Sequence, residues 1–67
     1  MDSITLNGAR HPLEGSLSVA ELLDTLGLAR KPVVVELNGE ALTSADHATT
    51  RVVPGARLEI ITLAAGG

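Results

Sequence analysis

The sequence predicts an α+β fold in which a mixed sheet of four to five strands packs on one helix. Two Asn-Gly pairs, at 7–8 and 38–39, each separate short strand-like runs, a pattern typical of β-hairpins. A capped amphipathic segment at 19–26 lies between the two hairpins, and an alternating run at 57–63 follows them. A helix between two hairpins, followed by a last strand, favours a single sheet covered on one face.

The first hairpin is predicted from residues 3–7, where Ile4 and Leu6 fall on one face. A type I′ turn at 7–8 needs positive φ at both central residues, which Asn and Gly tolerate. The chain then returns over 9–13, and Pro12 indicates an edge strand because it cannot donate a ladder hydrogen bond.

The helix is predicted over 19–26, with Ser18 as N-cap and Glu21 completing a capping box. Its apolar stripe has helical spacing and consists of Val19, Leu22, Leu23 and Leu26. Gly27 fits the left-handed position after the helix, and Leu28 fits the contact that follows a Schellman motif.

The second half of the chain predicts a strand at 33–37, a short return strand at 40–42 and a last strand at 57–63. The segment 43–50 is polar, and Ser44 is expected to cap one short helical turn there. Residues 52–55 predict a turn. We expect the first and last strands to lie side by side and parallel, since a long crossover separates them.

Composition excludes several classes of function. A chain of 67 residues makes one domain at most, and without cysteine it has neither disulfides nor thiolate ligands. Its net charge of −3 and scattered basic residues argue against nucleic acid. It contains no apolar stretch long enough for a membrane span and no signal peptide, so we expect no membrane association and a cytoplasmic location.

The sequence predicts no catalytic residue, metal site or intrinsically bound cofactor. His11 and His47 are far apart, lack metal-ligand spacing and are expected at the solvated surface, as are the charged side chains. No glycine-rich phosphate loop or nucleophile elbow is present.

The end of the chain points to a different chemistry. We predict a domain over 1–63 and a flexible tail over 64–67, made of Ala64, Ala65, Gly66 and Gly67. Four residues reach at most about 14 Å, enough to enter another protein's active site. The Gly67 carboxylate is ionised at neutral pH and a poor electrophile, so it becomes reactive only when another enzyme activates it, most simply as an adenylate.

Four segments resemble the ThiS sulfur carriers of thiamine biosynthesis. They are Ser-Val-Ala-Glu-Leu-Leu at 18–23, Val-Glu-Leu-Asn-Gly-Glu at 35–40, Pro-Gly-Ala-Arg-Leu-Glu-Ile at 54–60 and the terminal Ala-Ala-Gly-Gly. The resemblance covers nearly the whole chain, and its most specific element is the terminal Gly-Gly.

The resemblance implies a ubiquitin-like β-grasp fold and a protein co-substrate rather than an enzyme. It implies that a ThiF-like adenylyltransferase, related to ubiquitin-activating enzymes, uses ATP to adenylate Gly67. A sulfur donor protein then converts the adenylate to a thiocarboxylate, which delivers sulfur to a ThiG-like thiazole synthase.

A docking surface for these partners is predicted from strand alternation. If Leu58 and Ile60 face the helix, then Ile61 and Leu63 point to the opposite face, and Val34 likewise falls opposite its neighbours. We therefore predict an apolar partner site of Val34, Ile61 and Leu63 beside the tail.

Two alternatives remain open at the level of sequence. The first is a carrier with the same chemistry but another acceptor, either the small subunit of molybdopterin synthase or a carrier for cysteine or tRNA thiolation. The second is a ubiquitin-like modifier or a plain interaction module, in which the tail is joined to lysines or has no use.

Overall fold

The structure, a computed structural model, describes residues 2–63 of the chain. It contains one α-helix, one short 3₁₀ turn and seven strands in the described residues. In chain order these are β1 (Ser3–Leu6), β2 (Ala9–Pro12), β3 (Leu17–Ser18), α1 (Val19–Thr25), β4 (Val33–Leu37), β5 (Glu40–Leu42), η1 (Ser44–Asp46), β6 (Arg51–Val52) and β7 (Arg57–Thr62).

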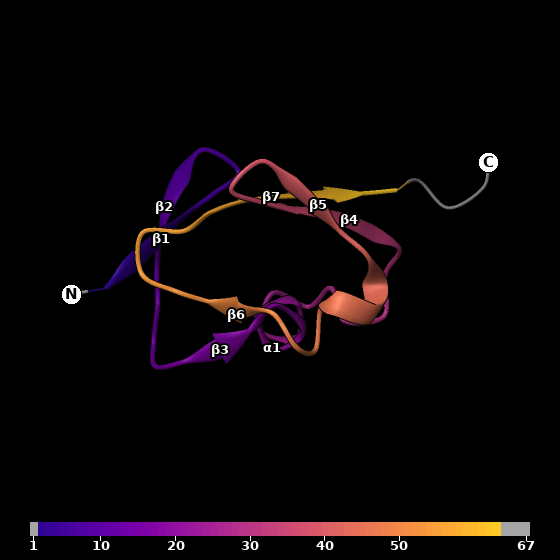
Figure 1. Ribbon diagram of the computed structural model, residues 1–67, viewed down its shortest axis with the longest axis horizontal. Coiled ribbons are helices and arrows are strands. Elements are labelled where there is room, and N and C mark those ends of the chain that lie inside the picture. The colour runs from indigo at the N-terminus through magenta and orange to yellow at the C-terminus, as the bar shows by residue number, and fades with distance from the viewer. Residues whose placement is uncertain (1, 64–67) are drawn as a thin grey trace.

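A five-stranded mixed sheet forms one layer, and α1 lies against one of its faces (Figure 1). The strand order is β2-β1-β7-β4-β5, which places the last strand in the centre. β7 runs parallel to β1 and antiparallel to β4. This arrangement confirms the α+β prediction, the predicted β-grasp architecture and the parallel pairing of the first and last strands.

The core lies between this sheet and α1 and is entirely aliphatic. From the helix, Val19, Leu22 and Leu23 are buried, as the predicted stripe requires. The sheet contributes Ile4, Val35, Leu58 and Ile60 from its three inner strands, and Leu13, Val52 and Ala56 complete the cluster. The alternation along β7 therefore places Leu58 and Ile60 toward the helix, as predicted.

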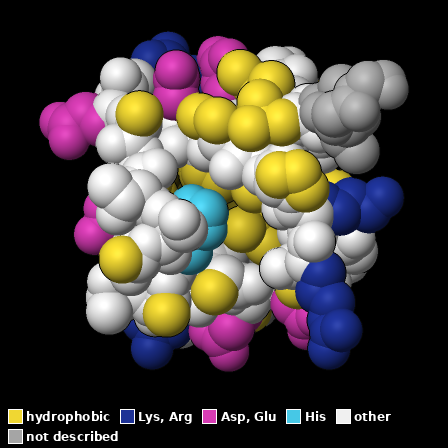
Figure 2. Space-filling view, turned by 90° about the vertical axis from the view of Figure 1, so that its right-hand side faces the viewer, with side chains coloured by type: hydrophobic (Ala, Val, Ile, Leu, Met, Phe, Trp, Pro, Cys, Tyr) yellow, Lys and Arg dark blue, Asp and Glu magenta, His cyan; other side chains and the backbone are white. Residues whose placement is uncertain are grey.

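Central β7 runs toward one end of the molecule, which Figure 2 views directly. Hydrophobic side chains gather on this end, around a histidine (Figure 2). Leu63 follows β7 in sequence, and the predicted tail begins at the next residue. The chain therefore leaves the sheet from its central strand, which is paired on both sides.

Both Asn-Gly pairs form the predicted hairpin turns, and their asparagines have a second role. Asn7 and Asn38 adopt a positive φ of 50°. The Asn7 amide group bridges to β7, because its Oδ1 accepts from the Ile60 N–H at 2.7 Å and its Nδ2 donates to the Ile60 carbonyl at 3.2 Å. On the other side of β7, the Asn38 Oδ1 accepts from the Arg57 N–H at 2.9 Å. The two turns thus hold the central strand from both flanks.

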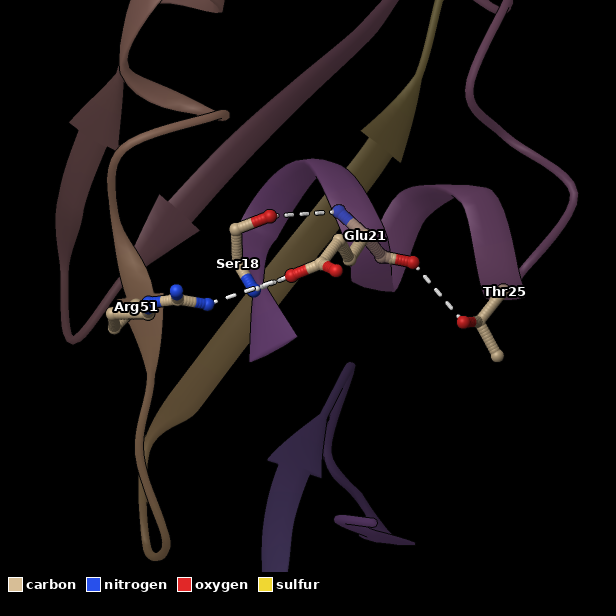
Figure 3. Close-up of polar contacts among 4 residues, drawn as sticks. All are labelled: Ser18, Glu21, Thr25 and Arg51. Atoms are coloured by element: carbon tan, nitrogen blue, oxygen red, sulfur yellow. Dashed lines mark hydrogen bonds and ion pairs between the residues drawn. The ribbon is translucent and has the colours of Figure 1, made fainter. Parts of the chain in front are cut away.

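The helix ends follow the sequence prediction closely. The Ser18 hydroxyl accepts from the Glu21 N–H at 3.0 Å, and the Glu21 carboxylate accepts from the Ser18 N–H at 2.8 Å (Figure 3). At the other end, the Leu28 N–H donates to the Leu23 carbonyl at 2.8 Å while Gly27 has φ of 76°, which is a Schellman motif. The helix itself stops at Thr25, one residue before the predicted end, and Leu26 is its C-cap.

The prediction of a turn over 52–55 is wrong at its first residue. Val52 belongs to β6, which pairs antiparallel with β3 in a second, two-stranded sheet. A strand of two residues shows no alternation in the sequence, so only its long-range partner defines it. This small sheet holds the segment before β6 against the helix N-terminus, where the Val19 N–H donates to the Thr50 carbonyl at 2.9 Å.

The short turn predicted within 43–50 is present as η1, but Ser44 is not its cap. Thr43 occupies the N-cap position, and the Asp46 carboxylate accepts from both the Thr43 N–H and the Thr43 hydroxyl. Ser44 is instead the first residue of the 3₁₀ turn. The sequence offers Thr and Ser side by side, and only the backbone path selects between them.

Replacing Asn7 with Gly tests its role in holding β7. Glycine keeps access to the positive φ of the turn but removes both hydrogen bonds to Ile60. We expect a loss of about 1–2 kcal/mol in the free energy of unfolding, measured with urea, from two bonds of about 1 kcal/mol each. Asn38→Gly is the matched control, because it makes the same change in the other turn and loses a single bond. Equal losses in the two variants would contradict this assignment.

The Glu21 carboxyl makes the stability of the fold depend on pH. Hydrogen bonds from the Ser18 backbone and side chain, followed by the charge of Arg51, lower its pKa from the ordinary value of 4.5. The folded pKa lies below the unfolded one, so this stabilisation is complete above pH 4.5 and is lost as the pH falls through the lowered value.

We therefore expect the wild type to lose more stability than Glu21→Gln as the pH falls below this value. Glutamine retains the capping geometry but has no charge to titrate. Urea unfolding over a pH series measures the difference between the two chains. Parallel pH profiles would show that Glu21 does not contribute to the acid sensitivity.

Candidate functional site

The candidate site is the end of the sheet where β7 gives way to the predicted tail. The last described contact of this strand is backbone to backbone, because the Leu63 N–H donates to the Pro32 carbonyl at 2.9 Å. One residue earlier, Thr62 lies opposite Val33 at the start of β4. The chain is thus held by its main chain up to residue 63.

Val34 and Ile61 form an apolar pair on the face of the sheet that α1 does not cover. They lie directly opposite each other in the antiparallel register of β4 and β7. The side chain of Ile61 is 51% exposed, whereas its neighbour Ile60 is buried against the helix. This alternation places one isoleucine in the core and leaves the other available to a partner.

Leu63 is also 51% exposed, but it has a different setting from Ile61. It lines a hollow of about 320 Å³ at the end of the molecule. The other lining residues come from the helix, the loop after it, the start of β4 and the η1 segment, and they are Leu23, Leu28, Ala29, Lys31, Pro32, Val33, Ser44 and His47. Because β7 ends at Thr62, strand alternation no longer fixes the direction of Leu63. The structure therefore brings together Val34 and Ile61, and it places Leu63 at the hollow.

The expectation that His47 lies at the solvated surface is wrong. Its side chain is half-buried beside the hollow, and its Nε2 is buried without a hydrogen-bond partner in the described part of the chain. The cause is backbone pairing, because the His47 carbonyl accepts from the Ala20 N–H at 2.8 Å and draws this segment against the helix. His11 is also half-buried, and its Nδ1 lies 2.9 Å from the Pro12 carbonyl oxygen.

Charged side chains lie next to this apolar pair on the uncovered face. Glu36 of β4 lies directly opposite Glu59 of β7, two residues along from the Val34–Ile61 pair. Two residues further along β7 comes Arg57, whose partner in the parallel register is Thr5. Sequence reasoning treated these charges as a general solvated surface. The signal that it missed is the register, which places the two carboxylates on adjacent strands.

The residues with the predicted chemistry, Ala64, Ala65, Gly66 and Gly67, lie outside the described residues. Within 2–63, no group of three or more histidine, acidic or cysteine side chains could hold a metal ion. No helix in the same range has the length and apolar character needed to cross a membrane.

Comparison with known proteins assigns the chain to a family. A family model described as the ThiS family matches residues 4–67, which include the central strand and the terminal glycines. The chain belongs to the ThiS family. No curated protein sequence matches it.

Solved structures agree with the ThiS assignment. The chain is similar to the crystal structure of a thiamine biosynthesis protein (ThiS) from Geobacter metallireducens, with 38% identity and a TM-score of 0.82. That similarity covers 97% of this chain and 99% of the other. An NMR solution structure of a thiamine biosynthesis protein from the same organism is also 38% identical, with a TM-score of 0.80 and coverage of 100% and 88%.

Proposed function

We propose that this ThiS-family chain is the sulfur carrier of thiamine biosynthesis and carries sulfur as a thiocarboxylate on Gly67. The observation that supports this proposal most directly is the family match, which extends through the terminal Gly66 and Gly67. The central position of β7 fits the role, because a rigid strand leads directly into the segment that must reach another enzyme.

The proposed chemistry has two steps. A carboxylate oxygen of Gly67 attacks the α-phosphate of ATP, so that an acyl adenylate forms and pyrophosphate leaves. Hydrosulfide, released by the sulfur donor, then attacks the activated carbonyl; AMP leaves with one of the two carboxylate oxygens, and the terminal group becomes a thiocarboxylate. Glycine at 66 and 67 leaves the carbonyl open to both attacks, because it has no side chain.

The partners of the carrier are enzymes of thiamine synthesis. We propose that they are a ThiF-like adenylyltransferase, which supplies the ATP-binding site, a sulfur donor protein and a ThiG-like thiazole synthase, which accepts the sulfur. In this scheme the chain is a protein co-substrate, binds no cofactor of its own and works in the cytoplasm.

The docking surface of this proposal is the Val34–Ile61 pair, and Leu63 with the tail residues Ala64 and Ala65 follows it in sequence. Covering an exposed isoleucine with a partner favours binding, because it removes apolar surface from water. The tail begins three residues after Ile61 in sequence, so one docking event would both bury Ile61 and deliver Gly67 to the partner's active site.

The identity of the reactive group is tested by intact-mass spectrometry. The full chain is incubated with ATP, the ThiF-like adenylyltransferase of the same organism and a sulfur source. We expect the mass increase that replacement of one oxygen by sulfur produces, located on the C-terminal peptide after proteolysis. A chain extended by one alanine after Gly67 is the control and should not gain this mass. Sulfur on the extended chain, or on another residue, would exclude Gly67 as the carrier group.

The docking role of Ile61 is tested with Ile61→Asp. The control is Val53→Asp, because Val53 is 53% exposed and so resembles Ile61 in exposure, but lies outside the site. Val53 lies outside any strand, so Val53→Asp should change the free energy of unfolding by about 0.5 kcal/mol or less. Ile61 lies in β7, so Ile61→Asp is expected to lower it by about 1 kcal/mol, and urea unfolding verifies that both chains are folded under assay conditions.

We expect Ile61→Asp to lower kcat/KM for adenylation by about tenfold or more, as truncation of a central interface residue typically does. Val53→Asp should be processed at the wild-type rate. If both variants behave alike in the adenylation assay, Ile61 has no special place in docking.

A further inference from the structure

We propose that the adenylyltransferase contacts the uncovered sheet face with a basic side chain, Arg or Lys, placed between Glu36 and Glu59. This inference rests on the proposed function and specifies the chemistry of the surface that the partner must present. It also assigns a binding role to two carboxylates.

The uncovered face has an ordered pattern along β7. Its outward side chains are Arg57, Glu59 and Ile61, followed by the end of the strand. Alternate residues of a strand lie about 7 Å apart, so the three side chains form successive basic, acidic and apolar positions. The apolar position lies nearest the tail, and the acidic one comes next.

At two of these positions, β4 places a side chain of the same kind directly opposite. Ile61 faces Val34, and Glu59 faces Glu36. Directly opposed residues of antiparallel strands have Cβ atoms about 4.5–5.5 Å apart, and like charges at this spacing destabilise the sheet. On its other side Glu36 faces Ala41 of β5, which offers no charge.

Within residues 2–63, neither Glu36 nor Glu59 forms an ion pair within 4.0 Å. The ion pair that residues 2–63 form is between Arg51 and Glu21, at 3.5 Å. Glu21 belongs to α1, which lies against the other face of the sheet (Figure 1). Arg57 extends from the same strand as Glu59 but makes no ion pair with it within 4.0 Å. The two opposed carboxylates therefore have no ion-pair partner among the described residues; the nearest basic residue of β7 on this face is Arg57, two positions from Glu59, and Glu36 is half-buried.

A single basic side chain from the partner would resolve this repulsion. It could bond both carboxylates at once, and the neighbouring Val34–Ile61 contact would exclude water and strengthen the attraction. Charge complementarity therefore selects a basic rather than an acidic partner surface. Because the glutamate pair lies two residues along the strands from the apolar pair, contacts to both would also fix the orientation of the carrier on its partner.

The experiment compares Glu36→Gln, Glu59→Gln and the double variant with the wild type. Glutamine keeps the size of the side chain and removes the charge. Glu14→Gln is the matched control, since it makes the same change at an exposed position beside Pro12, His11 and the helix. Binding to the adenylyltransferase is measured by calorimetry with the full chain, at low and high salt.

We expect each variant of the pair to weaken binding about tenfold, whereas the control stays within about twofold of the wild type. Added salt should weaken wild-type binding more than binding of the double variant, because screening removes a charge interaction that the variant lacks. A wild-type affinity that the Glu→Gln changes leave unaltered would overturn the inference. A wild-type chain that neither binds nor is adenylated would instead reject the proposed function.

Urea unfolding of the free chains gives an independent result. Removing either charge should raise the unfolding midpoint at low salt, and the double variant should gain less than the sum of the single variants, because both relieve the same repulsion. A lower midpoint in both single variants would show that the pair stabilises the free domain, which contradicts the inference. Concentration-dependent dimerisation lost in the same variants would assign the surface to a second copy and also overturn it.

Discussion

The pairing of β7 on both edges is the constraint on which the rest of the structure depends. This strand is last in sequence but central in the sheet, so neither hairpin belongs to the main sheet until β7 lies between β1 and β4. Its side chains Leu58 and Ile60 fill the core beneath α1. With no aromatic side chain in the protein, the core relies on aliphatic packing of this strand against the helix. Pairings between segments this far apart in sequence form more slowly than local ones, because more chain must be ordered before they gain any contact.

The two asparagine turns show how local and long-range structure are joined. Each asparagine serves its own turn through its positive φ and then binds the backbone of β7 through its side chain. The contact of Asn7 with Ile60 also continues β7's attachment beyond the end of β1, where the parallel ladder stops. The stretch of β7 that leads toward the tail is therefore held on the β1 side by a side chain rather than by a strand.

The two faces of β7 have different roles: the inner face packs in the core, and the outer face is the proposed binding surface. On the inner face, Leu58 and Ile60 are apolar and buried, as in an ordinary core. The outer face carries an exposed isoleucine and, beside it, two opposed carboxylates. Neither the isoleucine nor the carboxylate pair stabilises the isolated domain. A small domain has little stability in excess, so features of this kind are expected where a partner compensates for them. The same strand thus accounts for the fold and for the proposed direction of docking.

The sequence by itself determined the local elements. The Ser18–Glu21 capping box, the Schellman end at Gly27 and both Asn-Gly hairpins depend on residues close in sequence, and the structure contains each of them. Strand alternation also predicted which of Ile60 and Ile61 faces the core. The Gly-Gly end pointed to carrier chemistry because a terminal carboxylate needs no folded neighbours to be recognised.

Only the tertiary structure decided the features that depend on distant partners. The β3–β6 sheet, the burial of His47 and the position of Leu63 at the hollow all arise from segments brought together across the chain. The opposition of Glu36 and Glu59 is of the same kind, because a shift of one residue in register would separate them. Register is set by the whole packed sheet, and no short window of sequence contains that information.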